Sequence, residues 1–171
     1  MSIPVSFIQK LGRGDLEYVP REGWGGLDGQ NYVKESIQLT PISNVRIVST
    51  GEREDRCSNV SECAQVLRRI QKYHMKFCGL EDIAYNYMIG GDGRVYEGRT
   101  WNYLPYRSAE YCDHLRKSVV DIAYLGDFNK VSTPPDDYQA TLKLFIKYSI
   151  VDKNIKPDYT EYQDFLEDSQ E

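Results

Sequence analysis

The residues with the most distinctive chemistry are four cysteines and two histidines. They are Cys57, Cys63, Cys78, Cys112, His74 and His114. No Cys-x2-Cys pair and no histidine-bearing pair gives them the spacing of a zinc cluster, so we expect no metal site built from them. Cys57 and Cys63 are close enough for a disulfide if the chain turns back between them. Cys78 and Cys112 either form a second bridge or stay reduced, and the sequence favours neither.

A possible modification site lies between the first two cysteines. Asn59-Val60-Ser61 fits the N-x-[ST] acceptor motif for N-linked glycosylation. Such short motifs occur by chance, and free cysteines often serve as small buried hydrophobic residues. Together, the motif and the cysteine pair favour an oxidising, extracellular environment. We therefore predict glycosylation at Asn59 and an extracellular location, as a secreted protein or as the ectodomain of a membrane protein.

Asp82 and Glu97 are the carboxylates to weigh as a metal-independent hydrolytic pair. Two carboxylates can act as general acid and general base. Nothing in their sequence context distinguishes these two from ordinary solvated charges, and we expect no such catalytic centre.

Composition bounds the fold and the partners. A chain of 171 residues that is 40% hydrophobic and 27% charged has the make-up of one globular domain. Its net charge of -5 and pI near 5.2 argue against nucleic acid and anionic membrane surfaces as partners. No apolar run approaches the roughly 20 residues of a membrane span. The N-terminus lacks the pattern of a signal peptide, so we expect any targeting segment to lie outside this chain.

The first half of the chain predicts one strand and one helix. Residues 1–40 are rich in glycine and charge and are expected to be irregular. Residues 45–50 suit a strand. Asn59 and Glu62 resemble a capping box at the start of a helix, and Gly79 supplies its end. Residues at three-and-four spacing mark one face of this helix, namely Val66, Leu67, Ile70, Tyr73, His74 and Phe77.

The second half predicts a hairpin, a buried strand and another helix. Residues 85–89 and 94–97 flank a glycine-rich turn and predict two paired strands. Residues 119–125 are almost wholly apolar, as expected of a central strand. Pro134 and Pro135 precede helically spaced apolar residues from 138 to 150. The order of elements predicts an α/β fold, with a central mixed β-sheet flanked by helices.

Several segments resemble the peptidoglycan recognition proteins (PGRPs) of animals. They are residues 62–65, 70–75, 82–99 and 124–128, and they occur in that family's order and spacing. The resemblance implies a single domain over residues 1–171, with an irregular N-terminal segment 1–40 and a truncated C-terminal segment 157–171. It also implies an N-acetylmuramoyl-L-alanine amidase-like fold, a muropeptide groove on one face, and a disulfide between Cys57 and Cys63.

The resemblance allows the zinc ligands of the catalytic members to be checked by position. These members bind zinc through two histidines and a cysteine, with a tyrosine nearby. Val48 and Asp164 stand at the two histidine positions, and the cysteine position lies beyond Glu171. Tyr85 matches the tyrosine. Since ligands share a zinc-binding free energy on the order of ten kcal/mol, we expect no cofactor, no catalytic residues and no amidase activity.

The same resemblance points to a ligand groove. Its candidate groove or interface residues are His74, Tyr85, Trp101, Tyr103, Tyr106 and Arg107. The family's G-A-H element is replaced by bulky Pro105, Tyr106 and Arg107, which would exclude ligand by volume. No arginine lies in residues 119–128 to bind a diaminopimelate carboxylate. These aromatic and arginine side chains suit an interface, or they plug the groove, and both interpretations stay open.

The leading hypothesis is a non-catalytic domain that regulates innate immune signalling by pairing with other PGRP-family receptor domains. A direct peptidoglycan-binding receptor domain, recognising muropeptide fragments, is the first alternative. A zinc amidase is the second and is disfavoured by the missing ligands.

Overall fold

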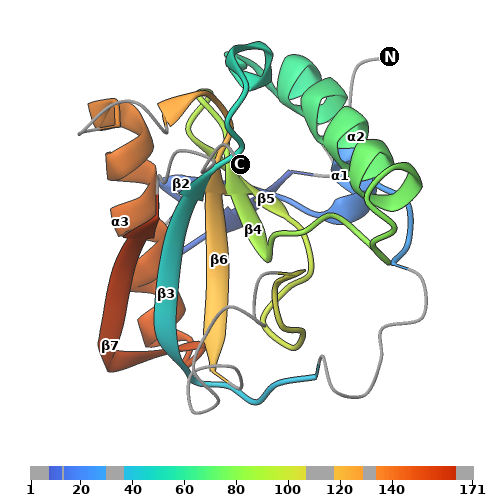
Figure 1. Cartoon of the computed structure of the whole chain (residues 1–171). Coiled ribbons are helices and arrows are strands. Elements are labelled where there is room, and N and C mark those ends of the chain that lie inside the picture. The colour runs from blue at the N-terminus through green and yellow to red at the C-terminus, as the bar shows by residue number, and fades with distance from the viewer. Residues whose placement is uncertain (1–7, 13, 30–36, 107–117, 129–133, 165–171) are drawn as a thin grey trace.

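The computed structural model describes residues 8–12, 14–29, 37–106, 118–128 and 134–164 (Figure 1). One seven-stranded mixed sheet has the order β1-β2-β5-β4-β6-β3-β7. The elements are β1 (Gln9–Leu11), β2 (Leu16–Val19), α1 (Arg21–Trp24), β3 (Ile42–Ser49), η3 (Arg53–Asp55), α2 (Val60–Lys76), β4 (Tyr87–Ile89), β5 (Arg94–Glu97), β6 (Val119–Tyr124), α3 (Asp136–Val151) and β7 (Ile155–Asp164). The predicted α/β fold is confirmed. No helix within these ranges is long and apolar enough to cross a membrane.

The sheet separates two hydrophobic cores. α1 and α2 pack on one face, where Trp24, Leu67 and Met88 are fully buried. α3 packs on the other face, where Phe145 joins Ile47 and Ile122. β6 lies between β4 and β3, parallel to both, and all its residues are buried. The predicted central strand is therefore confirmed, and it places one row of side chains in each core.

α2 begins where the sequence predicts. The Asn59 side chain accepts a hydrogen bond of 2.9 Å from the backbone N–H of Glu62, as a helix N-cap does. The Glu62 carboxylate accepts from the N–H and hydroxyl of Ser58, one residue before the cap. The helix ends at Lys76, and Gly79 follows with a left-handed backbone (φ 69°). Both predicted ends of this helix are thus explained by local chemistry.

The N-terminal segment is more regular than the sequence predicted, and the C-terminal segment contains a strand that the sequence did not predict. The expected irregular segment 1–40 contains β1, β2 and α1. β2 is stabilised by parallel pairing with β5, a contact distant in sequence that leaves no local periodic signal. Residues within 157–171 belong to β7, which pairs with β3 at the sheet edge. Tertiary pairing, not local propensity, makes these strands.

Candidate functional site

A pocket of about 380 Å³ lies between the C-terminal half of α2 and the segment that follows β3. Its lining residues are Thr50, Glu52, Asp55, Arg69, Ile70, Tyr73, His74 and Tyr85. His74 and Tyr85, two of the predicted groove residues, meet here with ring centroids 5.7 Å apart in an edge-to-face arrangement. The structure therefore brings together the helix residue and the strand-end residue that the sequence placed in one groove.

The environment of His74 determines its protonation state. Its Nδ1 accepts a hydrogen bond of 3.0 Å from the backbone N–H of Ala84. Burial and, to a smaller extent, the positive charge of Arg99 lower the pKa of His74 to about 4. At neutral pH the imidazole is therefore uncharged with its proton on Nε2. It can offer one N–H donor to a carbonyl or hydroxyl group of a ligand.

An ion pair forms part of the pocket wall. Arg69 Nη2 lies 2.6 Å from Asp55 Oδ1, with the Asp55 side chain only 4% exposed and that of Arg69 54% exposed. Neither residue was predicted from the sequence to line a site. The same holds for Thr50, Glu52, Ile70 and Tyr73. The sequence does show that Arg69 lies one helical turn before Tyr73 on α2, and this spacing could have indicated that both residues line the same pocket. The pocket thus combines an aromatic wall with a charged wall.

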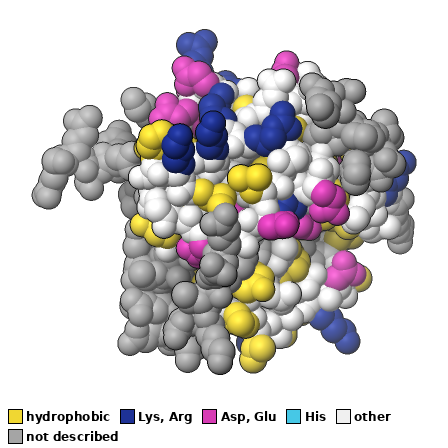
Figure 2. Space-filling view, turned by 90° about the vertical axis from the view of Figure 1, so that its right-hand side faces the viewer, with side chains coloured by type: hydrophobic (Ala, Val, Ile, Leu, Met, Phe, Trp, Pro, Cys, Tyr) yellow, Lys and Arg dark blue, Asp and Glu magenta, His cyan; other side chains and the backbone are white. Residues whose placement is uncertain are grey.

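The outer surface of α2 beside this pocket is basic. Figure 2 views the molecule from the α2 side and shows Lys and Arg side chains gathered in the upper part of that face. The basic residues of this helix are Arg68, Arg69, Lys72 and Lys76. The net charge of -5 therefore does not describe the charge next to the pocket.

The two positions assigned to zinc-binding histidines are neighbours in the sheet. Val48 of β3 and Asp164 of β7 are directly paired across parallel strands. The Val48 side chain is 4% exposed and packs in the α2-side core. Valine has no atom that can bind a metal. Among the described residues, no group of three or more His, Cys, Asp or Glu side chains could hold a metal ion.

Trp101 does not lie in this pocket, contrary to the expected groove position. Its ring centroid is 4.6 Å from that of Tyr87 and 5.6 Å from that of Phe145, in the α3-side core. Thr100 has a left-handed backbone (φ 67°), so the chain turns before residue 101. The resemblance that made Trp101 a groove candidate rests on residue types and does not describe this turn.

Tyr103 and Tyr106, two further groove candidates, do not line this pocket. The Tyr103 carbonyl accepts hydrogen bonds from the side chains of Gln38 and Asn86. Tyr106 donates its backbone N–H to Ala84, next to the His74 contact, and its side chain is 54% exposed. Arg107 is outside the described residues, as is His114. Tyr106 is therefore the exposed aromatic candidate at the edge of the site.

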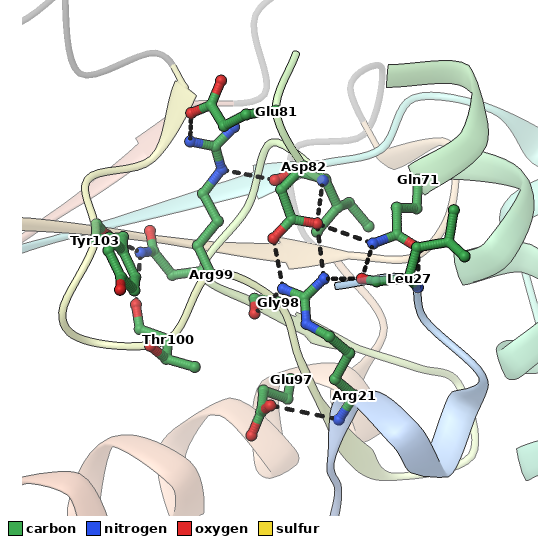
Figure 3. Close-up of polar contacts among 12 residues, drawn as sticks. Arg21, Leu27, Gln71, Glu81, Asp82, Glu97, Gly98, Arg99, Thr100 and Tyr103 are labelled. Atoms are coloured by element: carbon green, nitrogen blue, oxygen red, sulfur yellow. Dashed lines mark hydrogen bonds and ion pairs between the residues drawn. The ribbon is translucent and has the colours of Figure 1, made fainter. Parts of the chain in front are cut away.

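A buried polar network fixes the segment that carries Ala84 and Tyr85 (Figure 3). Asp82 is fully buried, lies 2.5 Å from Arg21 Nη2 and accepts a hydrogen bond from Gln71. Arg99 donates to the Ile83 carbonyl at 2.7 Å. The expectation that Asp82 is an ordinary solvated charge is therefore wrong.

Glu97 does not form a catalytic pair with Asp82. Its carboxylate accepts hydrogen bonds from the Tyr18 hydroxyl and from the Arg21 backbone, while Asp82 is held by the Arg21 guanidinium. Neither carboxylate lines the pocket beside His74. Their role in this arrangement is to hold backbone segments together.

The predicted disulfide is present. Cys57 and Cys63 are bridged, with their Cα atoms 5.1 Å apart, at the start of α2. Cys78 is an exposed free cysteine, and Cys112 is outside the described residues. Asn59 caps α2 through its side-chain oxygen, and its glycosylation stays a prediction.

Comparison with known proteins agrees with this geometry. Residues 38–167 match the family described as N-acetylmuramoyl-L-alanine amidase. Peptidoglycan-recognition protein SC1a of Drosophila melanogaster is 39% identical over 88 residues, 52% of this chain and 45% of that protein. A peptidoglycan recognition protein of Trichoplusia ni is 33% identical over 118 residues, 68% of this chain and 59% of that protein. The chain therefore spans about half the length of the curated relatives it matches.

Solved structures of PGRPs share the fold. The ectodomain complex of PGRP-LCa and PGRP-LCx bound to tracheal cytotoxin is similar with a TM-score of 0.75 and 27% identity, covering 85% of this chain and 82% of that one. Drosophila PGRP-SD has a TM-score of 0.77 at 22% identity, covering 87% and 83%, and this likeness shows the fold alone. From its sequence match, its disulfide and its fold, the chain belongs to the N-acetylmuramoyl-L-alanine amidase family and, within it, to the peptidoglycan recognition proteins.

Proposed function

We propose that this chain is a non-catalytic, extracellular peptidoglycan recognition domain that regulates innate immune signalling by pairing with other PGRP receptor domains. The non-catalytic part of this proposal rests on Val48. Its side chain is apolar and buried, and its position in β3 is directly paired with Asp164 of β7. A tetrahedral zinc site with two histidines and a cysteine needs nitrogen donors at these two positions. Elemental analysis is expected to find far less than one zinc per chain, and stoichiometric zinc with amidase turnover would contradict the proposal.

Pairing is supported by the relatives and by the exposed edge of the site. PGRP-LCa and PGRP-LCx form an ectodomain complex with tracheal cytotoxin bound. In this chain Tyr106 is 54% exposed and its backbone N–H donates to the Ala84 carbonyl, next to the His74 contact, while Tyr73 is 58% exposed on α2. Exposed aromatic residues are enriched at interface hot spots. A ring that plugged a filled groove would instead be buried.

The experiment measures binding of the purified chain to a PGRP-LCx ectodomain, with and without tracheal cytotoxin. Tyr106→Ala is expected to weaken pairing about tenfold or more, as loss of a hot-spot residue does. The control is Tyr162→Ala, which removes an exposed tyrosine from β7. If Tyr106→Ala leaves pairing unchanged and strengthens muropeptide binding, Tyr106 is a plug and this pairing surface is wrong.

Direct muropeptide binding is a second candidate because the pocket beside His74 is open. About 380 Å³ is within the size range of small-molecule sites. The Nε2–H of His74 and the Asp55–Arg69 pair supply directional polar contacts. Calorimetric titration of purified muropeptides should separate the two functions. Low-micromolar binding that is lost in His74→Phe, without any partner domain, would favour the direct receptor.

A further inference from the structure

A second pocket lies on the opposite face of the sheet, where β2 passes beside α3 (Figure 1). It has a volume of about 110 Å³. Its walls include five aromatic side chains, Tyr18, Tyr87, Trp101, Phe145 and Tyr148. All five belong to or pack against the α3-side core. This pocket shares no lining residue with the one beside His74.

The rings do not form one parallel stack. Tyr87 is inclined by 45° to Trp101 and by 63° to Phe145, with centroids 4.6 and 5.0 Å apart. Tyr18 is 6.3 Å from Tyr87 and inclined by 54°. Trp101 and Phe145 are nearly parallel, inclined by 23° with centroids 5.6 Å apart, and all of these rings line the same pocket. An aromatic face carries negative charge density and attracts cations.

Among the residues that line the pocket, Asp152 is the charged one. Asp152, the C-cap residue of α3, is exposed and lines the pocket. The end of this helix carries a partial negative charge, and its last turn has no basic residue. Asp152 forms no ion pair with any residue that the structure describes. The Glu97 carboxylate accepts a hydrogen bond from the Tyr18 hydroxyl.

The tyrosine rings of this pocket are uncharged, and one of them lies near a lysine. Burial raises the pKa of both Tyr18 and Tyr87, so these side chains stay uncharged phenols. The Lys147 ammonium lies 6.0 Å from the centroid of the Tyr148 ring, although Lys147 does not line the pocket. A cationic side chain of the protein therefore already lies near one of these rings, outside the pocket.

We propose that this aromatic pocket binds a small methylated ammonium group of the choline type. A volume of about 110 Å³ has room for a group of four heavy atoms such as trimethylammonium, since one water needs only about 10–15 Å³ of such space. Aromatic walls with a nearby carboxylate recognise quaternary ammonium ligands. The site goes beyond the proposed recognition function, because it lies on the face opposite the His74 pocket and needs neither muropeptide nor a partner domain.

The test is an NMR titration of the chain with choline. The two tryptophans serve as paired probes, because Trp101 lines the pocket and Trp24 is buried on the other face. We expect the Trp101 indole signal to shift with a Kd on the order of a millimolar while that of Trp24 does not. The uncharged isostere 3,3-dimethyl-1-butanol should bind about fivefold to thirtyfold more weakly. Equal affinity for the two compounds, or no shift at Trp101, overturns the proposal.

Variants test whether the Asp152 carboxylate contributes to choline binding. Asp152→Asn should weaken choline binding about fivefold and leave the neutral isostere unaffected. Asp158→Asn is the control, since Asp158 is an exposed acid of β7 that does not line the pocket. Phosphatidylcholine vesicles distinguish the source: binding that depends on Asp152 identifies a lipid headgroup, and binding of choline alone identifies a soluble ligand. If Asp158→Asn has the same effect as Asp152→Asn, only general surface charge is at work and the site is wrong.

Discussion

Two regions on the α2 side of the sheet differ in the interactions that stabilise them. The segment between α2 and β4 is fixed by buried polar contacts, chiefly those of Asp82 with Arg21 and Gln71. At the edge formed by β3 and β7, where the family resemblance leads us to expect zinc-binding histidines in catalytic relatives, the apolar Val48 packs in the core. The pocket beside His74 lies between these two regions.

The two regions differ in how well they tolerate substitutions. Removing one partner of a buried ion pair strands the other charge in the core, so the network resists single substitutions. A metal ligand near a sheet edge has no such constraint, since an apolar replacement adds burial worth about 1.5–3 kcal/mol. A chain can therefore lose a zinc site while keeping the groove wall. The following experiments test that contrast, from the largest expected effect to the smallest.

Breaking the Arg21–Asp82 pair should have the largest effect. Arg21→Met leaves the fully buried Asp82 carboxylate without its guanidinium partner, and we expect a loss of about 3–5 kcal/mol in the free energy of unfolding. Urea denaturation measures it. The control is Arg56→Met, because the Arg56–Asp127 pair is half exposed and should contribute less than about 1 kcal/mol. Similar losses in both variants would remove the distinction between the network and ordinary surface charges.

Acidification should weaken the groove wall through His74. Its pKa is about 4 in the folded chain and 6.5 in the unfolded chain, so the unfolded state binds more protons between these values. The free energy of unfolding should fall as pH falls from 6.5 to 4, by at most about 3 kcal/mol from this residue. His74→Asn keeps an acceptor for the Ala84 N–H but does not titrate. Identical pH profiles for the variant and the wild type would show that His74 is not buried as described.

The disulfide should stabilise the start of α2 by a smaller amount. Replacing Cys57 and Cys63 together by alanine opens a short ring, and we expect a loss of about 2 kcal/mol in the free energy of unfolding. Calorimetry of the variant and of the wild type measures this. Mass mapping that finds both thiols free in secreted protein would contradict the bridge directly.

Restoring a ligand at the sheet edge tests the other region. Val48→His places an imidazole among apolar side chains, which should cost about 1–3 kcal/mol without creating a zinc site. Thermal unfolding with and without added zinc is the measurement. Val48→Ala controls for the loss of packing alone. Stabilisation of Val48→His by zinc, absent in Val48→Ala, would show that the edge still retains a usable set of ligands.

Local chemistry made much of this fold predictable from the sequence. The cap at Asn59, the glycine-rich hairpin turn and the apolar run of β6 each act on their own neighbours. β1, β2 and α1 were missed because β2 depends on pairing with β5, far along the chain. The spacing of Tyr73 and Phe77 fitted the helical face, yet both are more than half exposed, since α2 extends beyond the sheet core at its C-terminal end.

The site was predictable only in part, for a related reason. His74 and Tyr85 were found through a resemblance that preserves their spacing, and they do meet. Asp82 could not be recognised as buried, because its partner Arg21 is 61 positions away. The resemblance placed Trp101 among the groove candidates, whereas in the structure it follows a left-handed turn at Thr100 and packs in the α3-side core. Long-range pairs and backbone turns are what a single sequence does not reveal.

The smallest expected effect separates the two roles of the Asn59 motif at the start of α2. Asn59→Ala removes the side-chain acceptor for the Glu62 N–H and should cost about 1 kcal/mol in the free energy of unfolding. It also removes the glycan predicted there. Ser61→Ala destroys the acceptor motif but leaves the cap, so protein from eukaryotic cells should lose the glycan mass with little change in intrinsic stability. Comparing both variants in unglycosylated bacterial material isolates the cap, because only Asn59→Ala should then unfold at lower urea. If Ser61→Ala is destabilised equally there, the first turn of α2 depends on the serine and not on the Asn59 cap.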